Sequence, residues 1–166
     1  LGYEVHVESS DVADITRSKL APGDTFCSLC ARLRRGIMYG LAQRLNCNKI
    51  ALGHHLDDLA ETLLLNIFFN GEIKSMPAKL HADDGRNIVI RPLAYCPEEK
   101  IARYAQLMEF PLIGCMCPAC GDQSLQRARV KRMISDLEKS NPGVRSSMLR
   151  ALSNVKPSHL LVAQPE

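Results

Sequence analysis

The pattern of hydrophobic and polar residues along this chain predicts both helices and strands. An amphipathic helix is indicated by Leu29, Leu33, Ile37, Leu41 and Leu45, which recur at every fourth position. Similar spacing and turn signals predict further helices over 11–19, 59–69, 97–109, 123–140 and 144–154. Short apolar runs predict strands over 2–9, 49–53 and 88–90, and the stretch 72–87 is expected to be mostly loop.

Strands that alternate with helices predict an α/β fold, in which flanking helices cover a parallel sheet with right-handed crossovers. We expect one domain over 1–166, in which 123–154 forms a helical, basic C-terminal segment. Ligands of such sheets bind beyond the carboxyl ends of the strands. The residues that follow the strand at 49–53 are therefore the first place to look for a functional site.

That place is occupied by the sequence Gly53-His54-His55-Leu56-Asp57-Asp58. A carboxylate at a helix start accepts backbone N–H bonds, so capping accounts for one of the two aspartates. Two acids beside two histidines also suit a general base or a site for a metal-bound nucleotide. The histidines are not expected to share one ion, because neighbouring side chains of an extended chain point to opposite faces.

Cysteines form two pairs with the same spacing, Cys27-x-x-Cys30 and Cys117-x-x-Cys120. Two thiolates at this spacing point into one turn and can bind one metal ion or one face of a cluster. A single pair could also be a redox pair, whereas two pairs in one chain favour a shared metal site. A closed four-thiolate zinc site is one form of it, and an iron–sulfur cluster is the other.

Positive charge is concentrated in two places although the net charge is only +3. Three arginines follow the first cysteine pair, at positions 32, 34 and 35, and guanidinium groups suit phosphate. The stretch 123–150 carries seven basic residues against two acids, namely Arg127, Arg129, Lys131, Arg132, Lys139, Arg145 and Arg150 against Asp136 and Glu138. This charge fits a nucleic-acid surface or a solvated helix face. A non-catalytic RNA-binding fragment is disfavoured by the few aromatic residues available for base stacking, four Phe and four Tyr.

Composition narrows the class of protein further. The 166 residues are 46% hydrophobic and 23% charged, which is typical of a globular domain. No apolar run is long enough to span a bilayer, and the start lacks the pattern of an export signal. Seven cysteines in such a chain favour metal ligands or reduced thiols over a disulfide scaffold, and a cytoplasmic location. Because the chain begins with Leu1 rather than Met, we expect it to be the later part of a longer protein.

Taken together, these motifs resemble the tRNA 2-thiocytidine synthetases, which are tRNA-cytidine 2-sulfurtransferases of the PP-loop ATPase superfamily. The resemblance is carried by Cys27–Gly36, Ala51–Asp58, Asn87–Cys96, Cys117–Gly121 and Pro157–Leu160. It implies an adenine-nucleotide-hydrolase-like α/β fold, a [4Fe-4S] cluster, and ATP with Mg²⁺. The implied reaction is ATP-dependent thiolation of cytidine 32 in the tRNA anticodon loop. The implied partners are this tRNA loop and a sulfur donor of the cysteine desulfurase type, with no membrane and with a homodimer allowed.

The resemblance also implies roles for individual residues. Asp58 and Arg34 match catalytic positions, and Gly53, His54 and Asp57 match nucleotide-binding positions. Cys27 and Cys30 match two cluster ligands. The third comes from the second pair, as Cys120 by its Cys-Gly-x-Gln context or as Cys117, in a segment two residues longer than the family pattern. Cys115 has no implied role. Contacts to tRNA are implied for Arg32, Arg35, Arg127, Arg129 and Arg132.

One family motif does not occur in the printed sequence. The ATP-binding loop Ser-Gly-Gly-x-Asp-Ser, which follows the first strand in this family, has no counterpart here, nor does any other glycine-rich phosphate loop. We therefore expect the N-terminal part of the fold to be missing. On this expectation the chain is a fragment of an active enzyme and does not thiolate tRNA by itself.

Overall fold

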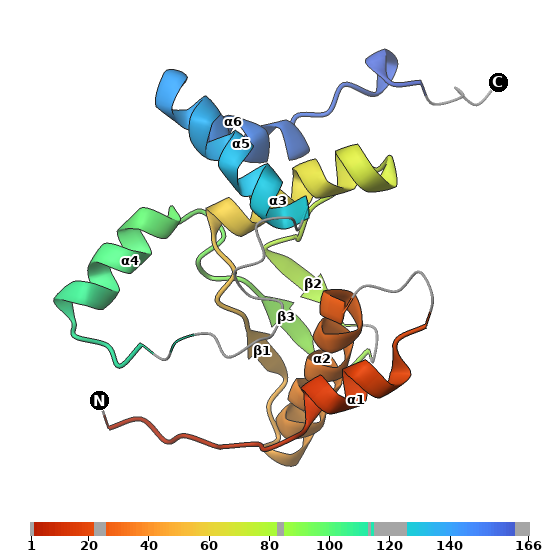
Figure 1. Ribbon diagram of the computed structural model, residues 1–166, viewed down its shortest axis with the longest axis vertical. Helices are drawn as coiled ribbons and strands as arrows, with labels where there is room; N and C mark the ends of the chain where they lie inside the picture. Colours follow the sequence, from red (N-terminus) through yellow and green to blue (C-terminus); the bar gives the residue numbers. More distant parts are fainter. Residues whose placement is uncertain (1, 22–25, 83–84, 113, 115–125, 162–166) are drawn as a thin grey trace.

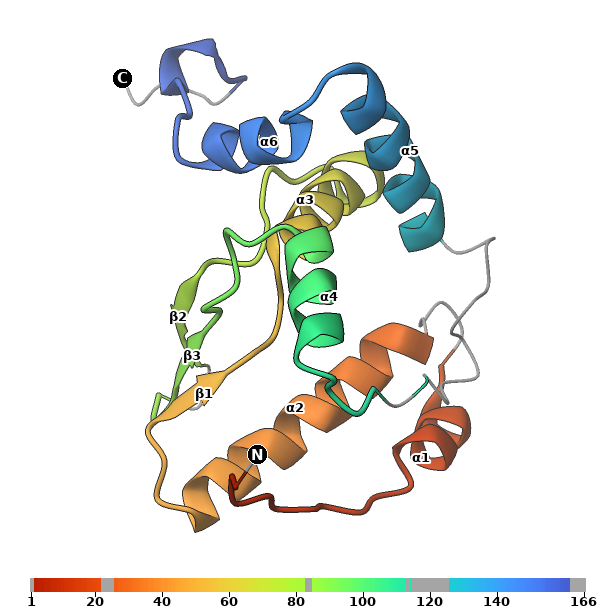
Figure 2. The ribbon, with the colours of Figure 1, turned by 90° about the vertical axis from the view of Figure 1, so that its left-hand side faces the viewer.

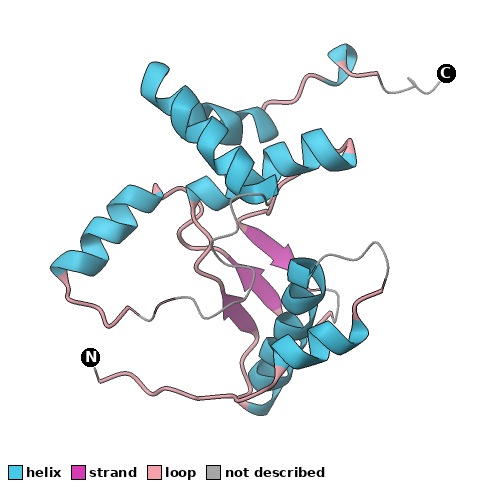
Figure 3. Cartoon of the chain, in the orientation of Figure 1, coloured by secondary structure: helices cyan, strands magenta, loops and turns pink. Residues whose placement is uncertain are grey.

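The computed structural model describes residues 2–21, 26–82, 85–112, 114 and 126–161. Its helices are α1 (Val12–Lys19), α2 (Phe26–Arg44), α3 (Leu56–Leu65), α4 (Glu98–Leu107), α5 (Gln126–Ser140) and α6 (Val144–Leu152). Its strands are β1 (Lys49–Ala51), β2 (Lys79–His81) and β3 (Ile88–Ile90). Figures 1 and 3 show a small sheet in the middle of the molecule with helices around it. The predicted α/β class is confirmed.

The sheet has the order β1-β3-β2 and is mixed, not wholly parallel as predicted. Strands β1 and β3 are parallel, with Lys49 opposite Ile88 and Ala51 opposite Ile90. Strand β2 pairs antiparallel with β3 and lies in the stretch that was expected to be loop. Its sequence Lys-Leu-His contains no apolar run, and all three of its residues are exposed. An edge strand of this kind is specified by its partner, so its own hydrophobic pattern does not reveal it.

The strand predicted over 2–9 is wrong for the described chain. These residues are extended but pair with no strand among the described residues. The alternation of Tyr3, Val5 and Val7 is real, yet each side chain is at least three-quarters exposed. An extended segment becomes a strand only when a neighbour takes up its backbone hydrogen bonds. Glu8, near the end of this segment, is joined to α2 by an ion pair with Arg44, while Figure 1 shows the chain before it extending away from the helices.

The long helix predicted from the every-fourth-residue stripe is confirmed as α2. Leu33, Ile37 and Leu41 are half-buried along one side, and Ala42 is buried. The helix ends as expected, because Asn46 adopts a left-handed conformation (φ 57°) that suits a helix C-terminus. Helix α2 packs against α1 and β1 and passes beside the sheet (Figure 2). Figure 2 shows the first residues of α2 at the end of the helix that lies away from the sheet.

Helices α3, α5 and α6 form the best-packed part of the chain, at the end of the sheet toward which β1 leads (Figure 2). Ala60 of α3 packs with Val130 and Ile134 of α5, which are one turn apart and almost fully buried. Met148 and Leu149 of α6 pack against this cluster. Burying a branched aliphatic side chain contributes roughly 1.5–3 kcal/mol, so this cluster holds the three helices in fixed positions. No helix in the described ranges is long and apolar enough to cross a membrane.

Candidate functional site at the carboxyl edge of the sheet

The first turn of α3 stands beyond the carboxyl end of β1, where the sequence predicted a site. The backbone N–H of Leu52 donates to the carbonyl oxygen of Ile90 at 2.9 Å, which keeps the exits of β1 and β3 side by side. Gly53 and His54 then lead into His55, the N-cap residue of α3. The two aspartates therefore lie in the first turn of a helix that begins at the edge of the sheet.

Asp58 is a capping residue, and part of its carboxylate remains available. Its Oδ2 accepts the backbone N–H of His55 at 3.1 Å and lies 3.3 Å from Nε2 of the same residue. Its Oδ1 faces Arg127, with 3.9 Å between Oδ1 and Nη1. Asp58 is partly exposed. The capping interpretation therefore accounts for one oxygen and leaves the second for chemistry.

Asp57 is buried and holds three helices together. Its Oδ2 accepts the backbone N–H of Glu98 at 2.7 Å, at the start of α4. Its Oδ1 lies 2.6 Å from Nε of Arg145, in the first turn of α6. Both oxygens thus have partners within the described chain, and the predicted contact of Asp57 with a nucleotide stays a prediction.

Glu61, one turn after Asp58, was not identified from the sequence as a site residue. Its side chain is only 6% exposed, and Oε2 accepts a hydrogen bond from Nη1 of Arg127 at 2.9 Å. Burial raises the pKa of Glu61, while the nearby Arg127 opposes that rise. The spacing of Asp58 and Glu61 was the available signal, because residues three apart lie on one side of a helix.

Cationic and histidine side chains face the same region from the strand exits. Burial lowers the pKa of His54, and the charge of Arg91 adds to this effect, so His54 is neutral near pH 7. Nδ1 of His54 is buried without a hydrogen-bond partner among the described residues. Arg91 directly follows β3, and its Nη1 donates to the carbonyl oxygen of Pro77 at 2.6 Å.

Arg91 also has a second cation nearby. Burial lowers the pKa of Arg91, and the charge of Arg35 on α2 lowers it further. Two guanidinium groups that approach each other beyond the carboxyl ends of strands suit an anion between or beside them. Arg91 was missed from the sequence, where the signal was a cation immediately after the run Ile88–Ile90.

The predicted cluster ligands are only partly within the described chain. Cys27 and Cys30 both lie at the beginning of α2, and Cys30 is half-buried with a free thiol. Cys115, Cys117 and Cys120 lie outside the described residues, so the choice between Cys117 and Cys120 stays a prediction. Within the described ranges no three or more His, Cys, Asp or Glu side chains are grouped so as to hold a metal ion.

The arginines predicted to act in catalysis or tRNA binding lie on two helices. Arg32, Arg34 and Arg35 are exposed on α2 just after Cys30. Arg129 and Arg132 are exposed on α5, whereas Arg127 of α5 turns toward α3. Figures 1 and 2 both show the beginnings of α2 and α5 on the same side of the molecule.

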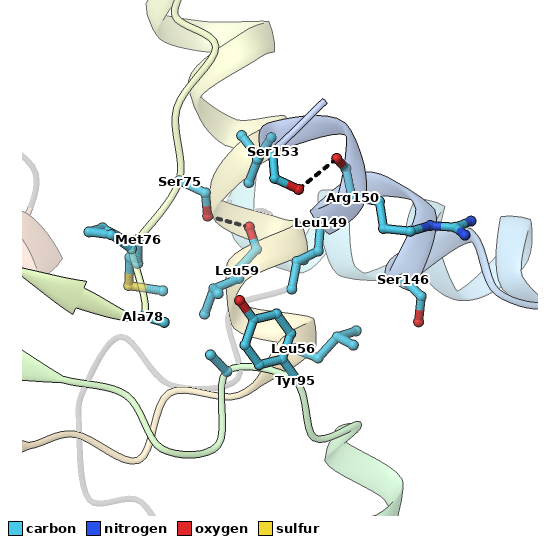
Figure 4. A pocket seen from close by; sticks show the side chains of 13 residues that line it. Leu56, Leu59, Ser75, Met76, Ala78, Tyr95, Ser146, Leu149, Arg150 and Ser153 are labelled. Carbon is cyan, nitrogen blue, oxygen red and sulfur yellow. Dashed lines mark hydrogen bonds between the residues drawn. The ribbon is translucent and has the colours of Figure 1, made fainter. Parts of the chain in front are cut away.

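A separate pocket of about 520 Å³ lies on another side of α3. Leu56 and Leu59 of α3, Met76, Tyr95 and Leu149 of α6 give it a mainly apolar lining (Figure 4). Ser75 closes one side by donating its hydroxyl to the carbonyl oxygen of Leu59 at 2.6 Å. None of the residues predicted from the sequence to act in catalysis or binding lines this pocket.

Comparison with known proteins decides the family. A model of the PP-loop domain matches residues 8–138. The chain belongs to the PP-loop domain family. Because this match begins at residue 8, it gives no support to the expectation that a preceding ATP-binding part has been lost.

Curated relatives in this family are closely similar over nearly the whole chain. Proteins named tRNA-cytidine(32) 2-sulfurtransferase are 53% identical over 96% of the chain in Geobacter sulfurreducens and 54% identical over its full length in Marinobacter nauticus. A protein of the same name from Coxiella burnetii is 57% identical over 91% of this chain. The matches cover 62%, 54% and 59% of those proteins, so the chain spans a little over half the length of the relatives it matches.

A solved structure has the same fold. The U34-tRNA thiolase NcsA from Methanococcus maripaludis, determined with its [4Fe-4S] cluster, superposes with a TM-score of 0.63 and 25% sequence identity. The match covers 81% of this chain and 44% of that one. The resemblance to PP-loop thiolases that was inferred from motifs is thereby confirmed.

Proposed function

We propose that this chain belongs to an enzyme that thiolates cytidine 32 of tRNA to 2-thiocytidine, using ATP with Mg²⁺ and a [4Fe-4S] cluster. The observation that carries the proposal is the identity of 53–57% to proteins named for this activity. The described geometry supports it, because the Gly-His-His-x-Asp-Asp motif lies at the carboxyl edge of the sheet, where α/β folds bind ligands.

The first cysteine pair fits two ligands of such a cluster. Cys27 and Cys30 are three positions apart in α2, a spacing that suits two ligands of one cluster, and the Cys30 thiol is free. The third ligand is proposed to be Cys120, with Cys117 as the alternative. When bound through three cysteines, the cluster would supply an iron atom that is open to sulfur. Arg34, one turn after Cys30, is proposed to provide positive charge beside it.

The reaction has to replace a poor leaving group at C2 of the cytosine ring. In the proposed route the C2 oxygen is first joined to AMP with release of pyrophosphate. Sulfur then bonds to C2 while the C2–O bond breaks and AMP leaves. Gly53, His54 and Asp57 are proposed to lie against the nucleotide, with Arg91 supplying positive charge for its phosphate. Asp58 is proposed to act as general base at Oδ1, where it takes a proton from the incoming sulfur.

Binding of tRNA is proposed to use the exposed arginines on both helices that follow the cysteine segments. Arg32 and Arg35 of α2 and Arg129 and Arg132 of α5 are the proposed phosphate contacts. The sulfur donor is proposed to be a cysteine desulfurase, the oligomer a homodimer and the location the cytoplasm. These last three proposals rest on the family alone.

Asp58→Asn in the full-length encoded protein tests the proposed function. Asn caps a helix about as well as Asp but cannot take a proton, so thiolation should fall roughly a hundredfold or more. The assay uses protein prepared without oxygen, tRNA, ATP, Mg²⁺ and sulfide, and quantifies 2-thiocytidine by nucleoside mass spectrometry. Melting temperature and iron content are the controls and should match wild type.

The other outcomes have clear meanings. If Asp58→Asn thiolates tRNA within a fewfold of wild type, Asp58 is only a cap and Asp57 is the next residue to test. If the wild-type protein binds stoichiometric zinc and no iron under these conditions, the site is a zinc site and the cluster proposal is wrong.

A further inference from the structure

Arg127 makes a contact that its position in a basic helix does not suggest. It lies in the first turn of α5, and its Nη1 donates to the Glu61 carboxylate at 2.9 Å and lies 3.9 Å from Oδ1 of Asp58. The guanidinium is about half exposed, whereas Glu61 is nearly inaccessible to water. One nitrogen thus joins α5 to two acids of α3.

Arg127 adds to the contacts that His55 makes with the Asp58 carboxylate. Asp58 already accepts the His55 N–H through Oδ2, which fixes one oxygen. Arg127 lies beside Oδ1, the oxygen proposed to take a proton. Glu61 in turn keeps Arg127 in place, because a buried carboxylate without a cation is costly in free energy. Orientation of Asp58 therefore depends on the pair formed by Glu61 and Arg127.

Arg127 also lies in the first turn of α5, directly after the second cysteine group in the sequence. Helix α5 is the first element after residues 115–125, which contain the second cysteine group. The contacts of Arg127 with Glu61 and Asp58 hold this first turn of α5 beside α3.

We propose that Arg127 is a positioning residue for Asp58 and not a phosphate contact for tRNA. This inference rests on the proposed function. If Arg127 turned outward to bind phosphate, Glu61 would be left buried without the hydrogen-bond partner that it has among the described residues. Because a single nitrogen makes both contacts, a lysine at this position should restore much of the effect, although lysine lacks the forked guanidinium.

The test measures kcat and KM for tRNA in the full-length protein with Arg127→Gln, Arg127→Lys and Lys131→Gln. Lys131 is the matched control, because it lies one turn along the same helix and its Nζ contacts Oε2 of Glu98 at 2.9 Å, so it joins α5 to α4. Arg127→Gln should lower kcat at least tenfold with KM within twofold of wild type. Arg127→Lys should recover most of that loss, and Lys131→Gln should keep kcat within twofold.

When Arg127→Gln folds, three results would overturn the inference while leaving the proposed function intact. The first is a raised KM, a lower salt dependence of tRNA binding and an unchanged kcat in Arg127→Gln, which would make Arg127 a phosphate contact. The second is an equal loss of kcat in Lys131→Gln, which would make Arg127 a structural tether only. The third is unchanged kinetics in Arg127→Gln. If Arg127→Gln does not fold, a kcat in Arg127→Lys as low as that of Asp58→Asn also overturns it. A wild-type protein that makes no 2-thiocytidine ends both proposals.

Discussion

Individual carboxylates in the first two turns of α3 have different surroundings, and these surroundings separate their roles. Asp57 has both oxygens taken up by other helices, Asp58 has one oxygen taken up by its own N-cap, and Glu61 has a buried ion pair. A residue whose oxygens are all engaged is suited to holding structure, and one with an accessible oxygen is suited to proton transfer. Asp58 is the residue of the three that best combines order with access.

Glu61 gives a pH-dependent prediction. Burial raises the pKa of Glu61 above its ordinary value of 4.5 despite Arg127, so the folded state binds the proton more tightly than the unfolded state does. Its contribution to stability is full below pH 4.5 and is lost as pH rises through the raised pKa. Glu61→Gln stays neutral, so its melting temperature relative to wild type should rise between pH 4 and pH 7.

The measurement is a series of thermal melts of both proteins from pH 4 to pH 7, compared as differences so that other titrating groups cancel. A difference that falls with rising pH would show that attraction to Arg127 outweighs the cost of burial. The same variant should still contain the α3–α5 core, because Ala60, Val130 and Ile134 are untouched.

At the scale of elements, a helix or strand could be predicted where its own sequence carries a hydrophobic pattern. Helix α2 was predictable because its apolar stripe faces α1 and β1. Strand β2 was not, because its pairing with β3 specifies it, and the strand at 2–9 was predicted from an alternation that has no partner among the described residues. The Asp58 site was predictable from strand–helix order. Glu61, Arg91 and Arg145 become site residues only through neighbours distant in the sequence, namely Arg127, Arg35 and Asp57.

The Glu138 carboxylate stabilises the start of α6, and this gives a prediction about the stability of that helix. Glu138 accepts the backbone N–H groups of Gly143 at 2.6 Å and Arg145 at 3.0 Å, which would otherwise be unpaired donors at the helix start. These bonds lower the pKa of Glu138, so its stabilisation is present above pH 4.5 and is lost as pH falls through the lowered pKa.

Glu138→Gln keeps one acceptor oxygen for two N–H donors and removes the charge that faces Arg145. It should therefore cost about 1 kcal/mol at pH 7 and less at low pH. Urea unfolding at pH 7 and at pH 3 measures both values. Asp136→Asn, on the same helix with only a surface pair to Lys139, is the control and should change stability by less than about 0.5 kcal/mol. Equal costs at both pH values would assign the effect to packing and not to the carboxylate.

On the scale of the whole molecule, the described chain brings together the starts of helices that carry exposed arginines and acids. The beginnings of α2 and α5 lie on the same side, and α3 begins at the carboxyl edge of the sheet close to α5 (Figure 2). Arginines that follow each cysteine segment are exposed there. An RNA that contacts both helices would therefore approach the proposed cluster and Asp58 together.

The salt dependence of tRNA binding tests this arrangement. Each phosphate contact that is lost should lower the slope of log affinity against log salt by about 0.7 to 0.9. The double variant Arg129→Gln, Arg132→Gln on α5 should thus lower the slope by about 1.5, and Arg32→Gln, Arg35→Gln on α2 should do the same. The matched control is Lys100→Gln, Arg103→Gln on α4, which removes two exposed cations that no proposal places at the tRNA. Affinities measured by filter binding from 50 to 300 mM salt give the slopes of the wild type and of the three variants. Equal slopes in all variants would show that the basic faces of α2 and α5 are solvated surfaces, and tRNA would then have to bind elsewhere on the protein.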